Sequence, residues 1–157
     1  MIDEPEITRS REEATAVIHI EVPRSGIQQV MEPAITEVLQ VLRSQGVQPT
    51  GPLFSFHHRM DPAVFDFEVG YPVSRPVRPA GRVEAGKLPV ATVARTVHHG
   101  GYEGLGRAWG ELSDWMKENG HRAGPQLWER YLAGPETGSD EARWRTELNR
   151  TVVEGDG

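Results

Sequence analysis

The sequence passes twice through the same order of strand and helix signals, and this duplication limits the fold more than any other feature. In the first half, residues 14–22 alternate apolar and polar side chains and predict a strand. A helical spacing of apolar residues follows and stops at Gly46. Gly51-Pro52 then leads into a short strand, and residues 64–69 alternate strictly enough to predict another one. The predicted order is strand, helix, strand, strand.

The second half repeats this order, again with a glycine after the helix and a Gly-Pro pair before the next strand. Its predicted elements are a strand over 88–97, a helix over 102–119, and strands over 127–132 and 144–148. We therefore expect a single domain over 14–153, made of two repeats at about 14–71 and 88–153. The proline- and glycine-rich stretch 72–86 would cross between the repeats, and residues 1–13 would form a flexible polar leader.

Two such units predict an α+β fold. Their strands would pair into one largely antiparallel sheet with two long helices on the same face. A pseudo-twofold axis would pass between the helices and leave a central cleft. Clefts of this kind are common ligand sites.

Composition narrows the classes of function. The chain has 157 residues and no cysteine, which excludes disulfides, thiolate zinc sites and cysteine nucleophiles. Its formal net charge of −6 disfavours direct binding to nucleic acid. No apolar stretch reaches the roughly 18 residues of a membrane span, and the acidic start lacks the apolar centre of a signal peptide. We therefore expect a cytoplasmic protein without a membrane partner.

Glu129 stands inside a run of apolar and aromatic residues that predicts a strand. Alternate strand residues share a face, so Glu129 should lie beside Leu127 and Tyr131. One acid on an apolar, aromatic wall suits a pocket for an apolar or cationic small molecule. The alternative is a surface glutamate paired with Arg130 or Arg122. If it is buried without a cation, its pKa should rise by desolvation.

Other aromatic and histidine side chains have two interpretations each. Tyr102 at the start of the second helix fits a pocket and the core equally well, and Trp109 within that helix fits core packing better. The pairs His57-His58 and His98-His99 place neighbouring rings on opposite faces of a strand, so neither pair forms a metal site by itself. We expect no metal and no cofactor, because zinc-hydrolase, phosphate-loop and serine-elbow motifs are absent.

Several of these segments together resemble the GyrI-like small-molecule-binding family. The same domain is the effector-binding part of AraC- and MerR-type multidrug-responsive regulators. The matching segments cover roughly 15–153 and are 88–105, Gly51-Pro52, Val69–Val73, Glu129–Tyr131 and Trp144–Glu147. Gly101 stands where the family usually has proline, and His57 where it often has tyrosine.

The resemblance implies a tandem β-α-β-β fold with a cleft around a buried glutamate, here Glu129. The ligand-binding residues that we expect are Glu129, Tyr102, Trp109, Tyr131, His57, Tyr71 and His99. The predicted function is a stand-alone protein that senses or sequesters bulky aromatic or cationic compounds. One alternative is a hydrolase that opens strained, cyclopropane-type rings with Glu129 and Tyr102 as catalytic residues. A minor alternative is a gyrase-inhibitor-like module that binds a protein.

Overall fold

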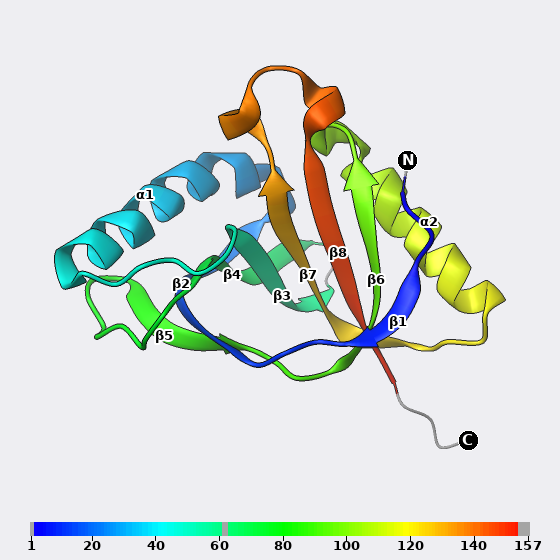
Figure 1. The fold of residues 1–157 in the computed structure, drawn as a ribbon, viewed down its shortest axis with the longest axis horizontal. Coiled ribbons are helices and arrows are strands. Elements are labelled where there is room, and N and C mark those ends of the chain that lie inside the picture. Colours follow the sequence, from blue (N-terminus) through cyan, green and yellow to red (C-terminus); the bar gives the residue numbers. More distant parts are fainter. Residues whose placement is uncertain (1, 61–62, 154–157) are drawn as a thin grey trace. The chain divides into compact units, whose positions relative to one another are not determined.

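The computed structural model describes residues 2–60 and 63–153, and its elements follow the duplicated order (Figure 1). The chain divides into two compact units. The N-repeat unit consists of Arg11–Pro89, and the C-repeat unit combines the segment up to Ser10 with the chain from Val90 onward. The expected α+β class and the repeated β-α-β-β order are confirmed.

The N-repeat unit contains one helix and four strands in the antiparallel order β3-β4-β2-β5. Its elements are β2 (Glu13–Pro23), α1 (Ile27–Gln45), β3 (Phe54–Met60), β4 (Val64–Pro72) and β5 (Val83–Leu88), with a short 3-10 turn, η1 (Arg24–Gly26), before α1.

Helix α1 packs on this sheet through the apolar stripe that its sequence predicts. Ala34, Val38 and Leu42 recur every fourth residue and are buried against the inner faces of β2 and β4. Gly46 ends the helix in the left-handed conformation at φ 64°, which glycine adopts without steric cost.

The C-repeat unit has the equivalent arrangement, with the antiparallel order β1-β6-β8-β7. Its strands and helix are β1 (Glu6–Arg9), β6 (Thr92–His99), α2 (Leu105–Glu118), β7 (Ala123–Ala133) and β8 (Arg145–Val152). Three 3-10 turns join them: η2 (Tyr102–Gly104), η3 (Pro135–Thr137) and η4 (Glu141–Arg143).

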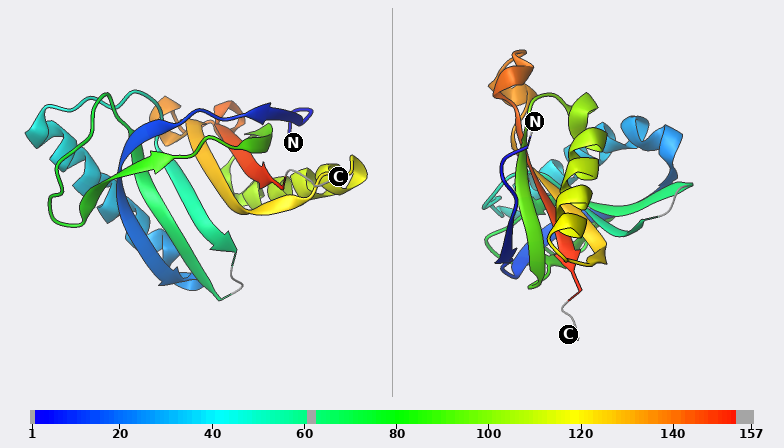
Figure 2. Two further views of the ribbon diagram at one scale, coloured as in Figure 1. Left: turned by 90° about the horizontal axis from the view of Figure 1, so that it is seen from below. Right: turned by 90° about the vertical axis from the view of Figure 1, so that its right-hand side faces the viewer.

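Helix α2 covers one face of the strands of this unit (Figure 2). Ala108, Leu112 and Met116 form its buried stripe and pack against Ala94 of β6 and Leu148 of β8. The alternation of side chains along the three strands then decides which polar residues share the α2 face.

Two expectations about local structure differ from what the structure shows. The strand expected over 88–97 is two strands, β5 and β6, because Pro89 interrupts the run and the halves pair with β2 and β8 respectively. Part of the expected flexible leader is strand β1, paired with β6 so that Glu6 lies opposite Arg95. The four residues of β1 contain a single apolar side chain, Ile7, which is too little alternation to reveal such a strand.

Within the described residues, no helix is long and apolar enough to cross a membrane.

Candidate functional site

Glu129 of β7 lies on the α2 face of the C-repeat unit, held by two hydrogen bonds. Trp109 Nε1, from α2, donates to Oε2 over 2.7 Å, and the Tyr131 hydroxyl donates to Oε1 over 2.7 Å. Hydrogen bonds to an ionised carboxylate are about twice as strong as neutral ones. The pair therefore fixes the position of the carboxylate and links helix to sheet.

Burial raises the pKa of Glu129, while the hydrogen bonds from Trp109 and Tyr131 and the nearby charge of His98 lower it to a smaller extent. Among residues 2–60 and 63–153, no lysine or arginine forms an ion pair with it. Within the described residues, the site thus holds an acid that is shielded from water and has no lysine or arginine partner.

Three aromatic rings gather beside this carboxylate, and we call them the aromatic cluster (Tyr102, Tyr131 and Trp144). The Tyr102 ring lies 5.8 Å from Tyr131 and 5.0 Å from Trp144, measured between centroids. Trp144 Nε1 donates to the carbonyl of Gly138, which anchors the indole. Tyr102 is 37% exposed, so the cluster reaches the surface at this ring.

The turn η2 presents Tyr102, and small residues make room for it. A Cβ on Gly134 would lie 2.4 Å from the Tyr102 hydroxyl, so only glycine admits the ring in this position. Burial, then the charges of Glu136 and Glu129, raises the pKa of Tyr102. The ring therefore keeps its hydroxyl proton at neutral pH.

His98 and Thr146 lie on the same face as Glu129. His98 of β6 pairs in register with Thr146 of β8, which pairs in turn with Tyr131 of β7. Both side chains are buried, at 4% and 0% exposure. His98 Nε2 bonds the carbonyl of Gly101 over 3.0 Å, whereas His98 Nδ1 and Thr146 Oγ1 have no hydrogen-bond partner in the described part of the chain.

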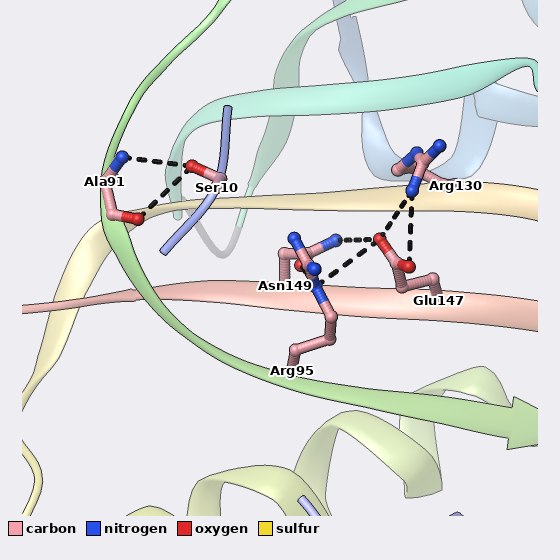
Figure 3. Close-up of polar contacts among 6 residues, drawn as sticks. All are labelled: Ser10, Ala91, Arg95, Arg130, Glu147 and Asn149. Atoms are coloured by element: carbon pink, nitrogen blue, oxygen red, sulfur yellow. Dashed lines mark hydrogen bonds and ion pairs between the residues drawn. The ribbon is translucent and has the colours of Figure 1, made fainter. Parts of the chain in front are cut away.

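The opposite face of the same sheet carries a separate polar network (Figure 3). Arg130 donates to both oxygens of Glu147 over 3.1 and 3.3 Å, and Asn149 donates to Glu147 over 3.0 Å. Arg95 lies 3.6 Å from the same carboxylate. The alternative in which Arg130 neutralises Glu129 is therefore wrong, because consecutive strand residues face opposite ways.

The other expected ligand-binding residues do not join this site within the C-repeat unit. His99 points to the opposite face of β6 from His98, and its Nε2 lies 2.7 Å from Asp3 Oδ1. His57 and Tyr71 belong to the N-repeat unit, where His57 stacks on Phe67 with a centroid distance of 5.1 Å. Burial, then the charges of Arg24 and His58, lowers the pKa of His57 to about 4.

Three residues of the site were missing from the expected ligand-binding set: His98, Thr146 and Trp144. The sequence does not show whether His98 or His99 lies on the α2 side of β6. Val93 and Ala94 lie on opposite faces of this strand and both are buried, so burial does not distinguish the two faces. Thr146 and Trp144 lie far from Glu129 in the sequence, and only the pairing of β7 with β8 brings them near.

A separate hollow of about 290 Å³ on the C-repeat unit is not lined by Glu129 or its neighbours. Ile2, Pro5 and Trp115 line it, together with the carboxylates of Asp3, Glu4, Glu111, Asp114 and Glu118. In the part of the chain that the structure describes, no group of three or more acidic or histidine side chains is placed to hold a metal ion.

Comparison with solved structures identifies the fold. The C-terminal domain of EcmrR superposes with a TM-score of 0.84 at 21% identity, covering 97% of this chain and 98% of that one. In the EcmrR–DNA complex in EcmrR-RPo, the TM-score is 0.83 at 22% identity. There the match covers 97% of this chain and 58% of that one, so the chain spans little more than half of EcmrR.

Two further structures share the fold at lower identity. A hydrolase encoded by lin2189 from Listeria innocua has a TM-score of 0.61 at 15% identity, covering 96% of this chain and 92% of that one. SAV2435, in a structure with bound tetraphenylphosphonium, has a TM-score of 0.64 at 9% identity, covering 96% and 94%. No curated protein matches the sequence.

The sequence itself also matches a family model, the GyrI-like small molecule binding domain, over residues 4–149. That match covers nearly the whole chain, and the repeated β-α-β-β order agrees with it. The chain therefore belongs to the family of GyrI-like small molecule binding domains.

Proposed function

We propose that the site around Glu129 binds bulky aromatic cations, with the carboxylate as counter-charge and the aromatic cluster as an apolar wall. The observation that carries the proposal is a buried carboxylate with two fixed donors and no lysine or arginine partner among the described residues. A cation placed beside it would offset the cost of burying the negative charge. Ring faces attract cations as well, through their quadrupole.

The surroundings of the aromatic cluster favour the same class of ligand. Glu136 lies close enough to Tyr102 to influence its pKa electrostatically. Glu103 and Glu141 share a hydrogen bond beside Gly101, and it raises the pKa of Glu141. These acids, together with a net charge of −6, would draw cations toward the exposed edge of Tyr102. SAV2435, which has the same fold, is known with tetraphenylphosphonium, a bulky aromatic cation.

The biological role that we propose is sensing or sequestering such compounds in the cytoplasm. The aromatic cluster would give most of the affinity through apolar burial and stacking, which discriminate weakly among ring shapes. Glu129 would select by charge. The match to the GyrI-like small molecule binding domain supports a ligand-binding role.

Three probes with the same biphenyl body test the proposal by isothermal titration calorimetry. Biphenylmethylamine is cationic with N–H donors, biphenylmethyl-trimethylammonium is cationic without donors, and biphenylmethanol is a neutral donor. The substitution Glu129→Gln keeps the size of the side chain and removes its charge. We expect it to weaken both cations by about tenfold or more, as for a charged hydrogen bond or ion pair, and to leave biphenylmethanol nearly unchanged.

The matched control is Glu111→Gln, a carboxylate on α2 that lines the separate hollow near Trp115. It removes one negative charge, as Glu129→Gln does, and should leave all three affinities within about twofold. Equal losses for charged and neutral probes in Glu129→Gln would remove the counter-charge role. If no probe binds the wild-type chain, the proposed ligand class is wrong.

The raised pKa of Glu129 also supports a second candidate, a hydrolase of strained electrophilic rings. As general base, the carboxylate would take a proton from water while the water oxygen bonds to a ring carbon. The ring C–C bond would break, its electron pair would move to the electron-withdrawing group of the substrate, and the proton would follow. Tyr102 would orient the substrate, and lin2189 of the same fold is described as a hydrolase.

Turnover separates the two candidates. A cyclopropane-containing electrophile incubated with the protein should gain the mass of one water if the chain is a hydrolase, and Glu129→Gln should abolish that gain. If mass spectrometry over many hours detects stoichiometric binding and no product, only the binding role remains.

A further inference from the structure

We infer that His98 and Thr146 form a hydrogen-bonding subsite next to Glu129, which takes an N–H or O–H group of the ligand. This inference rests on the proposed function and specifies its ligand further: an N–H or O–H group on the aromatic compound adds a contact that a fully substituted onium ion does not make. It is carried by two buried polar atoms that have no partner among the described residues, His98 Nδ1 and Thr146 Oγ1.

The two side chains are cross-strand neighbours on the α2 face. Thr146 of β8 pairs with His98 on one side and with Tyr131 on the other. Directly paired side chains in an antiparallel sheet have Cβ atoms about 5 Å apart. Glu129 lies two residues before Tyr131 on β7, and the Tyr131 hydroxyl donates to its carboxylate over 2.7 Å. The subsite and the proposed counter-charge therefore adjoin.

The hydrogen bond on the other side of the His98 ring decides which kind of ligand group fits. The Gly101 carbonyl can only accept, so Nε2, 3.0 Å away, carries the proton. In the neutral imidazole Nδ1 is then an acceptor, and the group that meets it must be a donor. The Thr146 hydroxyl can donate or accept, so it can complete the coordination of either an ammonium or a hydroxyl group.

The unpaired His98 Nδ1 and Thr146 Oγ1 make the folded chain less stable than it would be with apolar side chains at these positions. A buried polar atom without a partner destabilises the folded state, and valine could replace Thr146 with nearly the same shape. In native proteins such atoms are few. The described chain has three, and two of them are neighbours beside a buried acid.

Entry to the subsite would lie at the turn η2. A Cβ on Gly104 would lie 3.0 Å from His98 Cε1, so the turn covers the ring directly. Tyr102, in the same turn, is the exposed edge of the aromatic cluster.

The test uses the same three biphenyl probes and the substitution Thr146→Val. Loss of the hydroxyl should weaken biphenylmethylamine and biphenylmethanol by about three- to tenfold, the range of one hydrogen bond, and leave biphenylmethyl-trimethylammonium unchanged. Thr146→Ser keeps the hydroxyl and should retain most of the affinity. Thermal unfolding should show Thr146→Val at least as stable as the wild type, because an unpaired buried hydroxyl is removed.

Thr96→Val is the matched control on the same face of β6. Its hydroxyl donates to the Asp3 carbonyl over 2.7 Å, so this substitution should lower the unfolding temperature and leave all three affinities unchanged.

The outcomes separate the two proposals. Equal weakening of all three probes by Thr146→Val, or no weakening of any, overturns the subsite while the counter-charge role of Glu129 stands. Failure of every probe to bind the wild-type chain overturns both.

Discussion

The indole Nε1 of Trp109 and the carboxylate Oε2 of Glu129 are 2.7 Å apart, and this hydrogen bond joins helix α2 to strand β7. Trp109 therefore has two roles: its ring packs in the core, and its indole nitrogen holds the carboxylate of Glu129. Because the indole nitrogen can only donate, the bond stabilises the ionised form of the acid.

Trp109→Phe should therefore raise the pKa of Glu129 further and destabilise the fold. The ring keeps most of its packing, while the buried carboxylate loses one of its two donors, which costs about 1.5–3 kcal/mol at neutral pH. Urea unfolding measures this difference. Trp115→Phe is the control, since Trp115 also lies on α2 and stacks on His121 without contacting Glu129. Equal costs for the two variants would show that packing alone is responsible.

Glu129 should make stability fall as the pH rises. Burial raises its pKa, so the folded chain holds this proton more tightly than the unfolded chain does. The stabilisation is complete below the usual glutamate pKa of about 4 and is lost as the pH rises through the raised value. The unfolding free energy of the wild type minus that of Glu129→Gln should thus decrease from pH 4 upward and then level off. A difference that increases with pH would contradict the shift.

His57 should make the stability of the fold increase as the pH rises, opposite to the effect of Glu129. Burial lowers its pKa to about 4, so the ring is neutral in the folded chain at pH 7. Its contribution to stability is complete above the unfolded value of about 6.5 and is lost as the pH falls toward 4, a loss on the order of 3 kcal/mol. The His57 Hε1 resonance should titrate near pH 4 in NMR spectra. A midpoint near 6.5 would show that the ring is open to water.

The Glu147 network should show strong coupling. Removing this carboxylate by Glu147→Leu leaves Arg130 and Arg95 half-buried without their common partner, which should cost about 2–4 kcal/mol. Adding Arg130→Met should recover part of that loss, and a double-mutant cycle measures the coupling. The exposed pair Arg143 and Asp140, at 3.9 Å, should give a coupling below about 0.5 kcal/mol. Similar values for the two pairs would contradict a special role for burial.

Two glycines should respond oppositely to alanine. A Cβ on Gly70 would lie 1.9 Å from the carbonyl oxygen of Ala16 on the neighbouring strand, so Gly70→Ala should cost at least about 2 kcal/mol. Gly110 lies on α2 with nothing within 4 Å of a Cβ, and Gly110→Ala should stabilise the helix by about 1 kcal/mol. Thermal unfolding of both variants checks the pair. A tolerated Gly70→Ala would mean that β2 and β4 can separate.

The periodicity of the sequence determined the α+β class and the repeated element order, because alternation and helical spacing are local properties. Both helices occur where the apolar spacing predicts them, and Gly46 and Gly120 follow them with positive φ values. Glu129 and Tyr131 were likewise predictable as neighbours on one face, since residues two apart on a strand always are.

Only the tertiary structure decided what surrounds Glu129. Trp109 reaches it because α2 packs on the sheet, and Thr146 adjoins it because β8 pairs with β7 in one particular register. His98, not His99, shares its face because of how β6 is oriented toward α2. These contacts join residues 17 to 31 positions apart, and a register shift of one residue would exchange the faces. Local patterns do not encode that register, so it required the folded chain.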